Sequence, residues 1–178
     1  MSEPVRCWPT SDPLYIAYHD EEWGRPVRDE RGLYERLCLE GFQAGLAWIT
    51  ILRKRDAFRQ GFAGFDPERV ARFGERDVRR LLADAGIVRH RGKIEATIAN
   101  ARATLALREA ETPLRGLMWE YRDAADGKEL SRRLRAAGFR FVGPTTVHSS
   151  LEACGIVNGH RSDCWVWDAV EAERRSTL

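Results

Sequence analysis

The chain has 178 residues, of which 43% are hydrophobic and 10% aromatic, enough apolar surface for a sizeable folded core. Its 29 basic and 27 acidic residues give a net charge of +2, so any attraction to nucleic acid must come from local clusters of charge. The first residues lack a basic segment followed by an apolar one, and the longest apolar run, AGLAWITIL, is too short to cross a bilayer. We therefore expect a soluble, cytoplasmic protein without a membrane partner.

Helical periodicity dominates the chain from its start. Asp12 followed by Pro13 predicts an N-cap and the first turn of a helix over residues 13–23. Residues 29–62 continue as one long helix or as a pair. Further helices are expected over 66–73, 75–86, 92–110, 113–121, 127–139 and 145–157. Only residues 139–143, FRFVG, alternate like a strand, and one short strand makes no sheet. The sequence thus predicts an all-α protein with a single helical domain over residues 1–178.

A carboxylate interrupts the most apolar part of this pattern. Residues 37–51 read as one buried helix that contains Glu40, and Trp48 follows two turns later on roughly the same side. Aromatic residues also crowd the N-terminal segment. Flat rings beside one carboxylate suit a pocket that sandwiches a purine and binds its amino edge. Tryptophans at helical spacing are also typical of a core, and Glu40 could pair with a buried arginine, so the pattern alone leaves both interpretations open.

Residues 77–101 predict two helices joined by a short basic turn. The first helix is expected to stop at Gly86, and Gly92 would allow a close backbone approach before the second helix begins near Lys93. This pattern resembles a helix-hairpin-helix, in which turn amides and a helix N-terminus hold a DNA phosphate. An ordinary helical hairpin with a solvated turn fits equally well. We expect His90, within the turn, to form a hydrogen bond or face a phosphate rather than to bind a metal.

The four cysteines show no close pairing such as C-x-x-C. No feature of the sequence indicates an oxidising compartment, so we do not expect disulfides. Metal binding and simple burial are the two interpretations that remain for Cys7, Cys38, Cys154 and Cys164.

Five segments together resemble the 3-methyladenine DNA glycosylase I family, which removes 3-methyladenine from alkylated DNA. They are residues 12–24, 37–52, 85–102, 139–146 and 153–164, and the matches run from Arg6 to Cys164. The resemblance implies an all-helical fold of the helix-hairpin-helix glycosylase superfamily. It also implies a monofunctional enzyme of base excision repair that hydrolyses an N-glycosidic bond in double-stranded alkylated DNA. We expect a monomer without a nucleotide cofactor.

The resemblance also implies roles for individual residues. Glu40 would be the pocket carboxylate and Tyr18 its hydroxyl partner, the two catalytic groups. Aromatic rings would surround the base, namely Trp48, Trp8, Trp23 and Tyr15. Gly45 and Leu46, in the turn before Trp48 on the family pattern, would fill the gap that the flipped base leaves in the DNA stack. The hairpin would contact DNA through five further residues: Gly86, Arg89, Arg91, Gly92 and Lys93.

A structural zinc site completes what the family implies. Its positions match Cys7, His19, His160 and Cys164, a donor set that is chemically sound for closed tetrahedral zinc. One zinc per chain would fasten residues 7–19 to residues 160–164. Four protein ligands leave no open position for an activated water, so the metal is expected to be structural.

The sequence departs from the family pattern at three places. No residue separates Cys7 from Trp8, and His148, Ser149 and Ser150 stand where the family commonly has Tyr-Ser-Phe, so contacts on the C-terminal side of the pocket are expected to differ. The chain beyond Cys164 follows no family pattern. Other helix-hairpin-helix glycosylases have an aspartate after the hairpin; the family resembled here lacks it, and this chain has Ala99 and Asn100 in that region. Two alternatives follow: a related glycosylase acting on another alkylated purine, or a catalytically silent module that binds damaged DNA.

Overall fold

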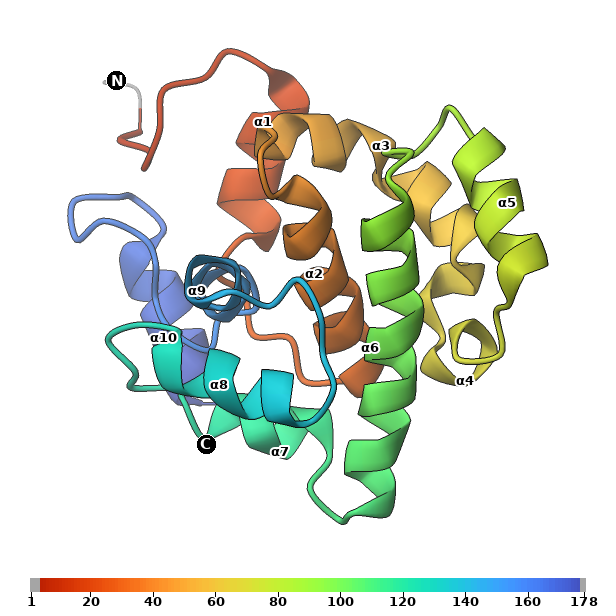
Figure 1. The fold of residues 1–178 in the computed structure, drawn as a ribbon. Helices are drawn as coiled ribbons and strands as arrows, with labels where there is room; N and C mark the ends of the chain where they lie inside the picture. Colours follow the sequence, from red (N-terminus) through yellow and green to blue (C-terminus); the bar gives the residue numbers. More distant parts are fainter. Residues whose placement is uncertain (1–3, 177–178) are drawn as a thin grey trace.

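The computed structural model describes residues 4–176, which form helices joined by loops and contain no strand (Figure 1). The prediction of an all-α fold is confirmed. The elements are α1 (Pro13–Ala17), a π-helical turn η1 (Tyr18–Glu22), α2 (Glu30–Gln43), α3 (Trp48–Gly61), a 3₁₀ turn η2 (Ala63–Phe65), α4 (Pro67–Val70), α5 (Glu75–Ala83), α6 (Arg91–Glu109), α7 (Leu114–Trp119), α8 (Lys128–Ala136), α9 (Pro144–Ala153) and α10 (Trp167–Arg175).

Helix α1 begins as the sequence predicts. The Asp12 carboxylate accepts hydrogen bonds from the backbone N–H groups of Leu14 and Tyr15, at 2.9 and 3.4 Å. Pro13 occupies the first helical position, where its missing N–H has no intrahelical partner to lose. The helix continues into η1, whose Tyr18 and His19 are both buried. The N-terminal segment is thereby fixed against the rest of the molecule.

Helix α2 is the centre of the fold, and it packs against α3, α6, α7 and α9. Most of its residues from Leu33 to Phe42 are buried, including several with no exposed surface. From Arg36 to Phe42 every residue of α2 is buried, whatever its direction around the helix, so this part of α2 lies in the core. Because α2 carries Glu40, the carboxylate is held inside the molecule by the packing of its whole helix.

Of the two expectations for residues 29–62, the pair of helices is confirmed, and the interpretation of residues 37–51 as one helix is wrong, because the chain breaks between Gln43 and Trp48. Gly45 has a φ of +82°, a left-handed conformation that suits glycine and ends the helix. The Lys93 ammonium donates to the carbonyl oxygens of Phe42 and Ala44, at 2.8 and 2.7 Å, and so satisfies the open end of α2. Trp48 therefore begins a second helix, α3, and does not share a helical face with Glu40.

The segment between α5 and α6 differs in detail from the predicted hairpin. Helix α5 ends at Ala83 rather than at Gly86. A Cβ atom on Gly86 would lie 2.8 Å from the Cβ of Ala57, so this glycine permits close packing on α3 and does not terminate a helix. His90 is the N-cap of α6, and its Nδ1 accepts a hydrogen bond from the Lys93 N–H at 3.2 Å. The expected hydrogen-bonding role of His90 is confirmed, while the helix-hairpin-helix motif remains a prediction.

Two C-terminal features complete the fold. Residues 139–143 form a loop instead of the alternating strand-like segment, with Phe139 and Val142 buried and Phe141 exposed. Helix α10, which the sequence pattern did not predict, packs Val170 against Cys164 and Val166. Its sequence, WDAVEAERR, is rich in good helix formers, so propensity could have indicated it. Within residues 4–176 no helix has the length and apolar character needed to cross a membrane.

Candidate functional site

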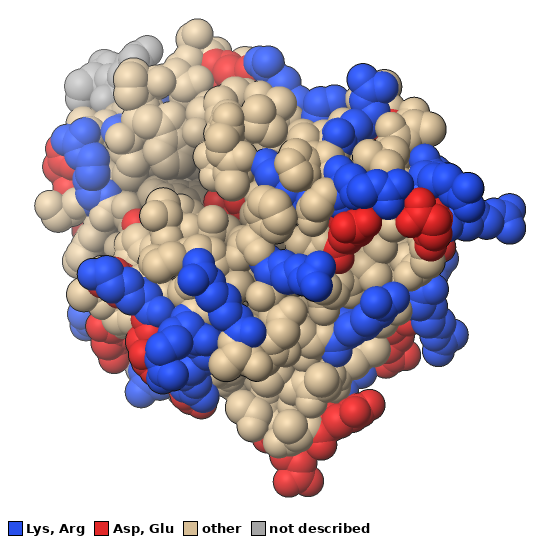
Figure 2. All heavy atoms as spheres, in the orientation of Figure 1, with Lys and Arg blue, Asp and Glu red and all other residues tan. Residues whose placement is uncertain are grey.

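A cavity of about 160 Å³ opens between the N-terminal segment, α2, α3 and α9. A cavity of about 150 Å³ accommodates a benzene molecule, so this one suits an aromatic ring. Figure 2 shows the face hollowed between α1 and α9, with Lys and Arg side chains spread over neighbouring parts of the same face. The lining residues are Trp8, Tyr15, Tyr18, Trp23, Glu40, Gln43, Trp48 and Ser149.

All six residues that the sequence predicts for a base pocket line this cavity. Two more lining residues, Gln43 and Ser149, were not predicted. Gln43 lies three residues after Glu40 on the same helix, so helical spacing could have indicated it. Ser149 comes from α9, within the segment 148–150 where the sequence departs from the family pattern near the pocket. Glu40 and Trp48 lie on two different helices, α2 and α3. Both side chains nevertheless line the cavity.

Glu40 is a buried carboxyl group with only 6% of its surface exposed. Burial raises its pKa from 4.5 to about 7, while the charge of Arg36 opposes this effect and that of Glu152 adds to it. Its carboxylate forms no hydrogen bond with any residue between 4 and 176. An isolated buried carboxyl group is costly, so it is arranged for an occupant of the cavity rather than for the fold.

A buried arginine does lie near Glu40, as one of the two sequence interpretations proposed. Arg36 stands one turn earlier on α2, but its guanidinium forms its ion pair with Glu22. It also donates to the Tyr18 hydroxyl oxygen at 3.4 Å and lies 5.8 Å from the centre of that ring. Arg36 therefore influences Glu40 through its charge, and the carboxylate stays unpaired.

Tyr18 combines a buried ring with a hydroxyl group at the cavity. Burial raises the pKa of its hydroxyl well above the usual range, so the group stays protonated and can donate a hydrogen bond. Its ring lies 5.5 Å from that of Trp48, at an interplanar angle of 38°. The hydroxyl accepts from Arg36 and keeps its own proton for another partner.

The remaining walls are aromatic. The Trp8 ring lies 5.1 Å from Tyr15 and 5.0 Å from Trp23, so these three form a continuous cluster. The indole N–H groups of Trp8 and Trp48 are buried and have no hydrogen-bond partner among the described residues. Such a cavity can hold a flat, electron-poor ring between aromatic faces and place a carboxylate at its edge.

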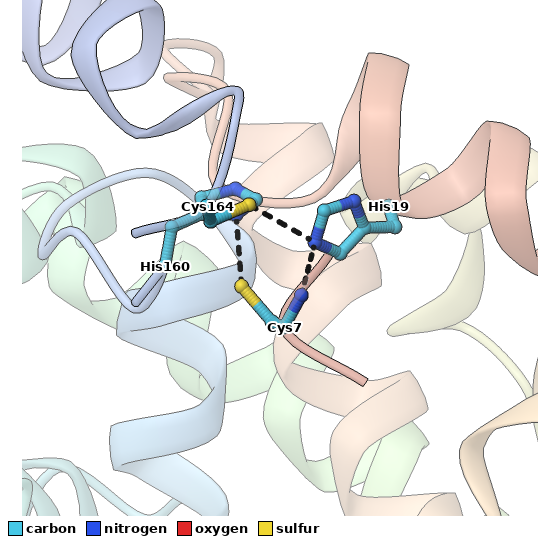
Figure 3. Close-up of side chains that lie close together, drawn as sticks. All are labelled: Cys7, His19, His160 and Cys164. Carbon is cyan, nitrogen blue, oxygen red and sulfur yellow. Dashed lines mark hydrogen bonds between the residues drawn. The ribbon is translucent and has the colours of Figure 1, made fainter. Parts of the chain in front are cut away.

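A second cluster lies beside the cavity, where the two ends of the chain meet (Figure 3). The donor atoms of its four residues lie within 4.8 Å of one another. Cys7 Sγ is 3.4 Å from His160 Nδ1, and Cys164 Sγ is 3.6 Å from both His19 Nε2 and His160 Nδ1. Tetrahedral zinc with ordinary Zn–S and Zn–N bonds needs donor separations of about 3.4 to 3.8 Å. The residues Cys7, His19, His160 and Cys164 fit zinc.

The outer ring nitrogens of both histidines are also fixed. His19 Nδ1 lies 2.7 Å from the carboxylate of Asp20, and His160 Nε2 donates to the Trp23 carbonyl oxygen at 3.0 Å. Metal-binding histidines are commonly oriented by a carboxylate or a carbonyl in this way. The residues from His160 to Cys164 form a turn, closed by a 2.9 Å hydrogen bond from the Cys164 N–H to the Arg161 carbonyl.

The cluster and the cavity share a wall. The Trp8 ring lies 4.7 Å from the His19 ring, and the Trp23 ring lies 4.4 Å from the His160 ring. Both tryptophans also line the cavity. Any group that holds the four donors together therefore also fixes two walls of the cavity.

The predicted DNA-contacting cations behave differently from one another. Lys93 is only 8% exposed and directs its ammonium inward to α2, so the expected contact of its charge with a phosphate is corrected to a structural contact. Arg91 pairs with Glu75 and Glu95. Arg89 is exposed and forms no ion pair with the described residues. Leu46, next to the left-handed Gly45, is 39% exposed near the cavity.

Comparisons with known proteins agree with this geometry. A family model described as methyladenine glycosylase matches residues 8–167. The DNA-3-methyladenine glycosylase 1 of Escherichia coli strain K12 is 46% identical, over 89% of this chain and 95% of that protein. A crystal structure of 3-methyladenine DNA glycosylase I has a TM-score of 0.86 at 45% identity, covering 90% of this chain and 98% of the other. A variant of such an enzyme solved with 3-methyladenine has a TM-score of 0.84 at 35% identity, covering 89% and 94%.

Proposed function

The chain belongs to the methyladenine glycosylase family, and from this premise we propose that it is a DNA-3-methyladenine glycosylase of base excision repair. The reaction is hydrolysis of the N-glycosidic bond of 3-methyladenine in alkylated double-stranded DNA. The observation that carries this proposal is Glu40, a buried carboxylate without a hydrogen-bond partner among the described residues, set within an aromatic cavity of ring size.

The chemistry of the substrate explains why a cavity of this kind suffices. Methylation at N3 makes the purine cationic in the nucleotide, so the base is already a good leaving group. Water adds to the sugar carbon C1′ and releases a proton to solvent as the bond to N9 breaks, and the base leaves with the bonding electron pair as neutral 3-methyladenine. Strong acid catalysis is not needed, and selective recognition of the cation can supply most of the rate enhancement.

Glu40 and Trp48 would discriminate the methylated base from adenine. Once the nucleotide is flipped out, stacking on Trp48 favours the electron-poor ring. The Glu40 carboxylate accepts hydrogen bonds from the amino edge and stabilises the positive charge. Neutral adenine gains less from both contacts, which confines the reaction to damaged bases.

The protonated Tyr18 hydroxyl would act beside Glu40 as a hydrogen-bond donor to the base. Arg36 orients this hydroxyl through the 3.4 Å contact to its oxygen. Tyr15, Trp8 and Trp23 would complete the walls around the base. No lysine is among the residues that line the cavity, which supports a monofunctional hydrolase without a Schiff-base step.

DNA would be held by the loop before α3 and by the turn before α6. The exposed side chain of Leu46, with Gly45, would fill the gap left by the flipped nucleotide. Arg89 and the amides near Gly86 and Gly92 would hold backbone phosphate in a helix-hairpin-helix, with Arg91 at the edge of this surface. We propose that the protein acts as a monomer.

Zinc would be held by Cys7, His19, His160 and Cys164, whose spacing and donor types fit it. When bound, it supplies a covalent-like cross-link between the N-terminal and C-terminal segments and takes no part in the chemistry. Its effect on the reaction would be indirect, through the positions of Trp8 and Trp23.

The proposal is tested by incubating the protein with methylated duplex DNA and separating the released bases by chromatography. We expect 3-methyladenine as the main product, with little 7-methylguanine or 3-methylguanine. Dominant release of another base would favour the related glycosylase of different specificity, for which Ser149 in the cavity wall is the observation to pursue. Binding to methylated DNA without release of any base would favour the silent DNA-binding module.

A further inference from the structure

Phe141 has an unusual backbone conformation and an unusual exposure. Its φ is +54°, in the left-handed region that bulky residues rarely adopt. Its side chain is 42% exposed, although its neighbours Phe139 and Val142 are both almost fully buried. Strained conformations of this kind persist where the surrounding structure enforces them, and they gather at functional sites.

The backbone on both sides of Phe141 is held by buried polar side chains. Asn100 of α6 donates to the Arg140 carbonyl at 3.1 Å and accepts from the Arg140 N–H at 2.7 Å. Ser131 of α8 donates its hydroxyl to the Val142 carbonyl at 2.6 Å. Asn100 is 2% exposed and Ser131 is 1% exposed, so these contacts are part of the core. The aromatic ring is thus fixed outside the core.

This ring lies between the two elements expected to contact DNA. A Cβ atom on Gly41 would be 3.3 Å from the Cβ and carbonyl oxygen of Phe141, which places the loop directly on α2 beside Glu40. A Cβ atom on Gly92 would be 3.8 Å from the Phe141 ring. The ring also stands edge-on to His90, 6.1 Å away, in the turn before α6. Phe141 therefore lies against α2 at the residue that follows Glu40 and beside the turn before α6.

The charges around this ring fit a polyanion. Arg140 and Arg89 are exposed and form no ion pair with other described residues. Figure 2 shows many Lys and Arg side chains on one face of the molecule, with some carboxylates among them. Cations matched to phosphates, beside an apolar wedge matched to bases, are the features by which proteins hold distorted DNA.

We propose that Phe141 is a further DNA-contacting residue, whose ring packs against the bases beside the flipped nucleotide. Leu46 and Phe141 would then support the opened duplex from two loops rather than one. Asn100 and Ser131 are positioning residues that act through the backbone of residues 140–142. The inference rests on the proposed glycosylase function and adds a contact to it.

The test compares Phe141→Ala with the wild-type protein in binding to a duplex that contains a stable abasic-site analogue. We expect affinity to fall on the order of tenfold, the usual effect of losing one aromatic contact to a base. Binding of free 3-methyladenine to the cavity should not change, and Phe141→Trp should retain duplex binding. Val5→Ala is the matched control, because Val5 is an apolar side chain with 49% exposure in the N-terminal segment.

A second variant separates the contact from folding. Phe141→Gly accepts the left-handed backbone without strain, so its Tm should not fall below that of Phe141→Ala, yet duplex binding should be equally weak. A 2-aminopurine opposite the abasic analogue reports stacking directly, and its fluorescence should differ between the wild-type complex and both variants. Wild-type duplex affinity in Phe141→Ala, or loss of free-base binding in that variant, would overturn the inference. Failure of the wild-type protein to release any base would instead overturn the proposed function.

Discussion

Arg36 and Glu40 lie one turn apart on α2, yet the guanidinium of Arg36 pairs with Glu22 and the carboxylate of Glu40 pairs with no described residue. An arginine four residues away is the usual partner of a helical glutamate. Here the arginine serves Glu22 and Tyr18, so the negative charge of Glu40 is left for the cavity. This separation underlies the first three predictions.

Replacement of Glu40 by glutamine should leave the fold intact and remove most 3-methyladenine release. The amide keeps the size of the side chain but loses the charge that stabilises a cationic base. We expect a loss of about 1 to 3 kcal/mol of transition-state stabilisation, measured as kcat/KM on methylated duplex DNA. Glu109→Gln, the same substitution at an exposed position of α6 that does not line the cavity, is the matched control. Full activity of Glu40→Gln would exclude the carboxylate from the mechanism.

The activity should depend on the ionisation of Glu40. Burial raises its pKa to about 7, so the free protein holds the carboxyl group neutral below that pH. A neutral group cannot stabilise the cationic base, and kcat/KM should therefore rise with pH and level off above about 7. The rising limb should be absent from the residual activity of Glu40→Gln. A wild-type profile that is flat between pH 5 and 8 would contradict this assignment.

Stability should show the opposite dependence on pH. Because the pKa of Glu40 is higher in the folded state, the folded protein holds the proton more tightly than the unfolded chain between pH 4.5 and about 7. The free energy of unfolding contributed by this group therefore falls as pH rises through that window. The shift corresponds to about 3 kcal/mol at most.

Glu40→Gln removes this cost, so it should be more stable than the wild type at pH 8 and similar to it near pH 4.5. Denaturant unfolding of both proteins across this range measures the difference. A difference that does not change with pH would show that burial of the charge at Glu40 is not the source.

Local chemistry explains which parts of the fold could be predicted from sequence. Asp12 and Pro13 predict the start of α1 because capping depends on neighbouring residues alone. Gly45 is a local signal for the break after Gln43, which the run of apolar residues masks, but the Lys93 ammonium that satisfies the end of α2 lies fifty residues later in the chain. The same contact directs the Lys93 ammonium to α2, whereas the sequence analysis expected it to contact DNA. A charged residue in a sequence does not reveal in which direction its side chain points.

Prediction of the cavity shows the same limit. Rings near a carboxylate indicated Glu40, Trp48 and Tyr18, and family resemblance gave their roles. Ser149 reaches the cavity because α9 packs on α2, and Arg36 pairs with Glu22 because the N-terminal segment packs on α2. These contacts join parts of the chain that are distant in sequence. The unpaired state of Glu40 is likewise a property of three-dimensional arrangement.

Arg89, in the turn before α6, and Lys93, in the first turn of α6, should respond differently to substitution. Lys93→Met leaves the carbonyl groups of Phe42 and Ala44 without their donor, so it should lower the free energy of unfolding by about 1 to 3 kcal/mol. Arg89→Ala removes an exposed charge and should leave stability unchanged. It should instead weaken binding to any duplex and reduce the salt slope by about one phosphate contact. Denaturant unfolding and binding at several salt concentrations test the pair. A large stability loss in Arg89→Ala, with none in Lys93→Met, would reverse the two roles.

The last prediction concerns the four-residue cluster that joins the ends of the chain. We expect one zinc per chain by elemental analysis, because four donors suited to zinc lie within 4.8 Å of one another, three of their separations are 3.4 to 3.6 Å, and both histidines have their outer nitrogens fixed. Cys164→Ser should lower the Tm more than Cys38→Ser. Both cysteines are buried, but Cys38 only packs in the main core and accepts a long contact from Asn100.

Removal of the metal from the wild-type protein with a chelator should also weaken binding of free 3-methyladenine, since Trp8 and Trp23 line the cavity and contact the two histidines. A protein purified without chelator that is free of metal, stable and fully active would exclude the zinc site. A metal-loaded protein whose base binding survives metal removal would instead show that the aromatic walls hold their positions without it.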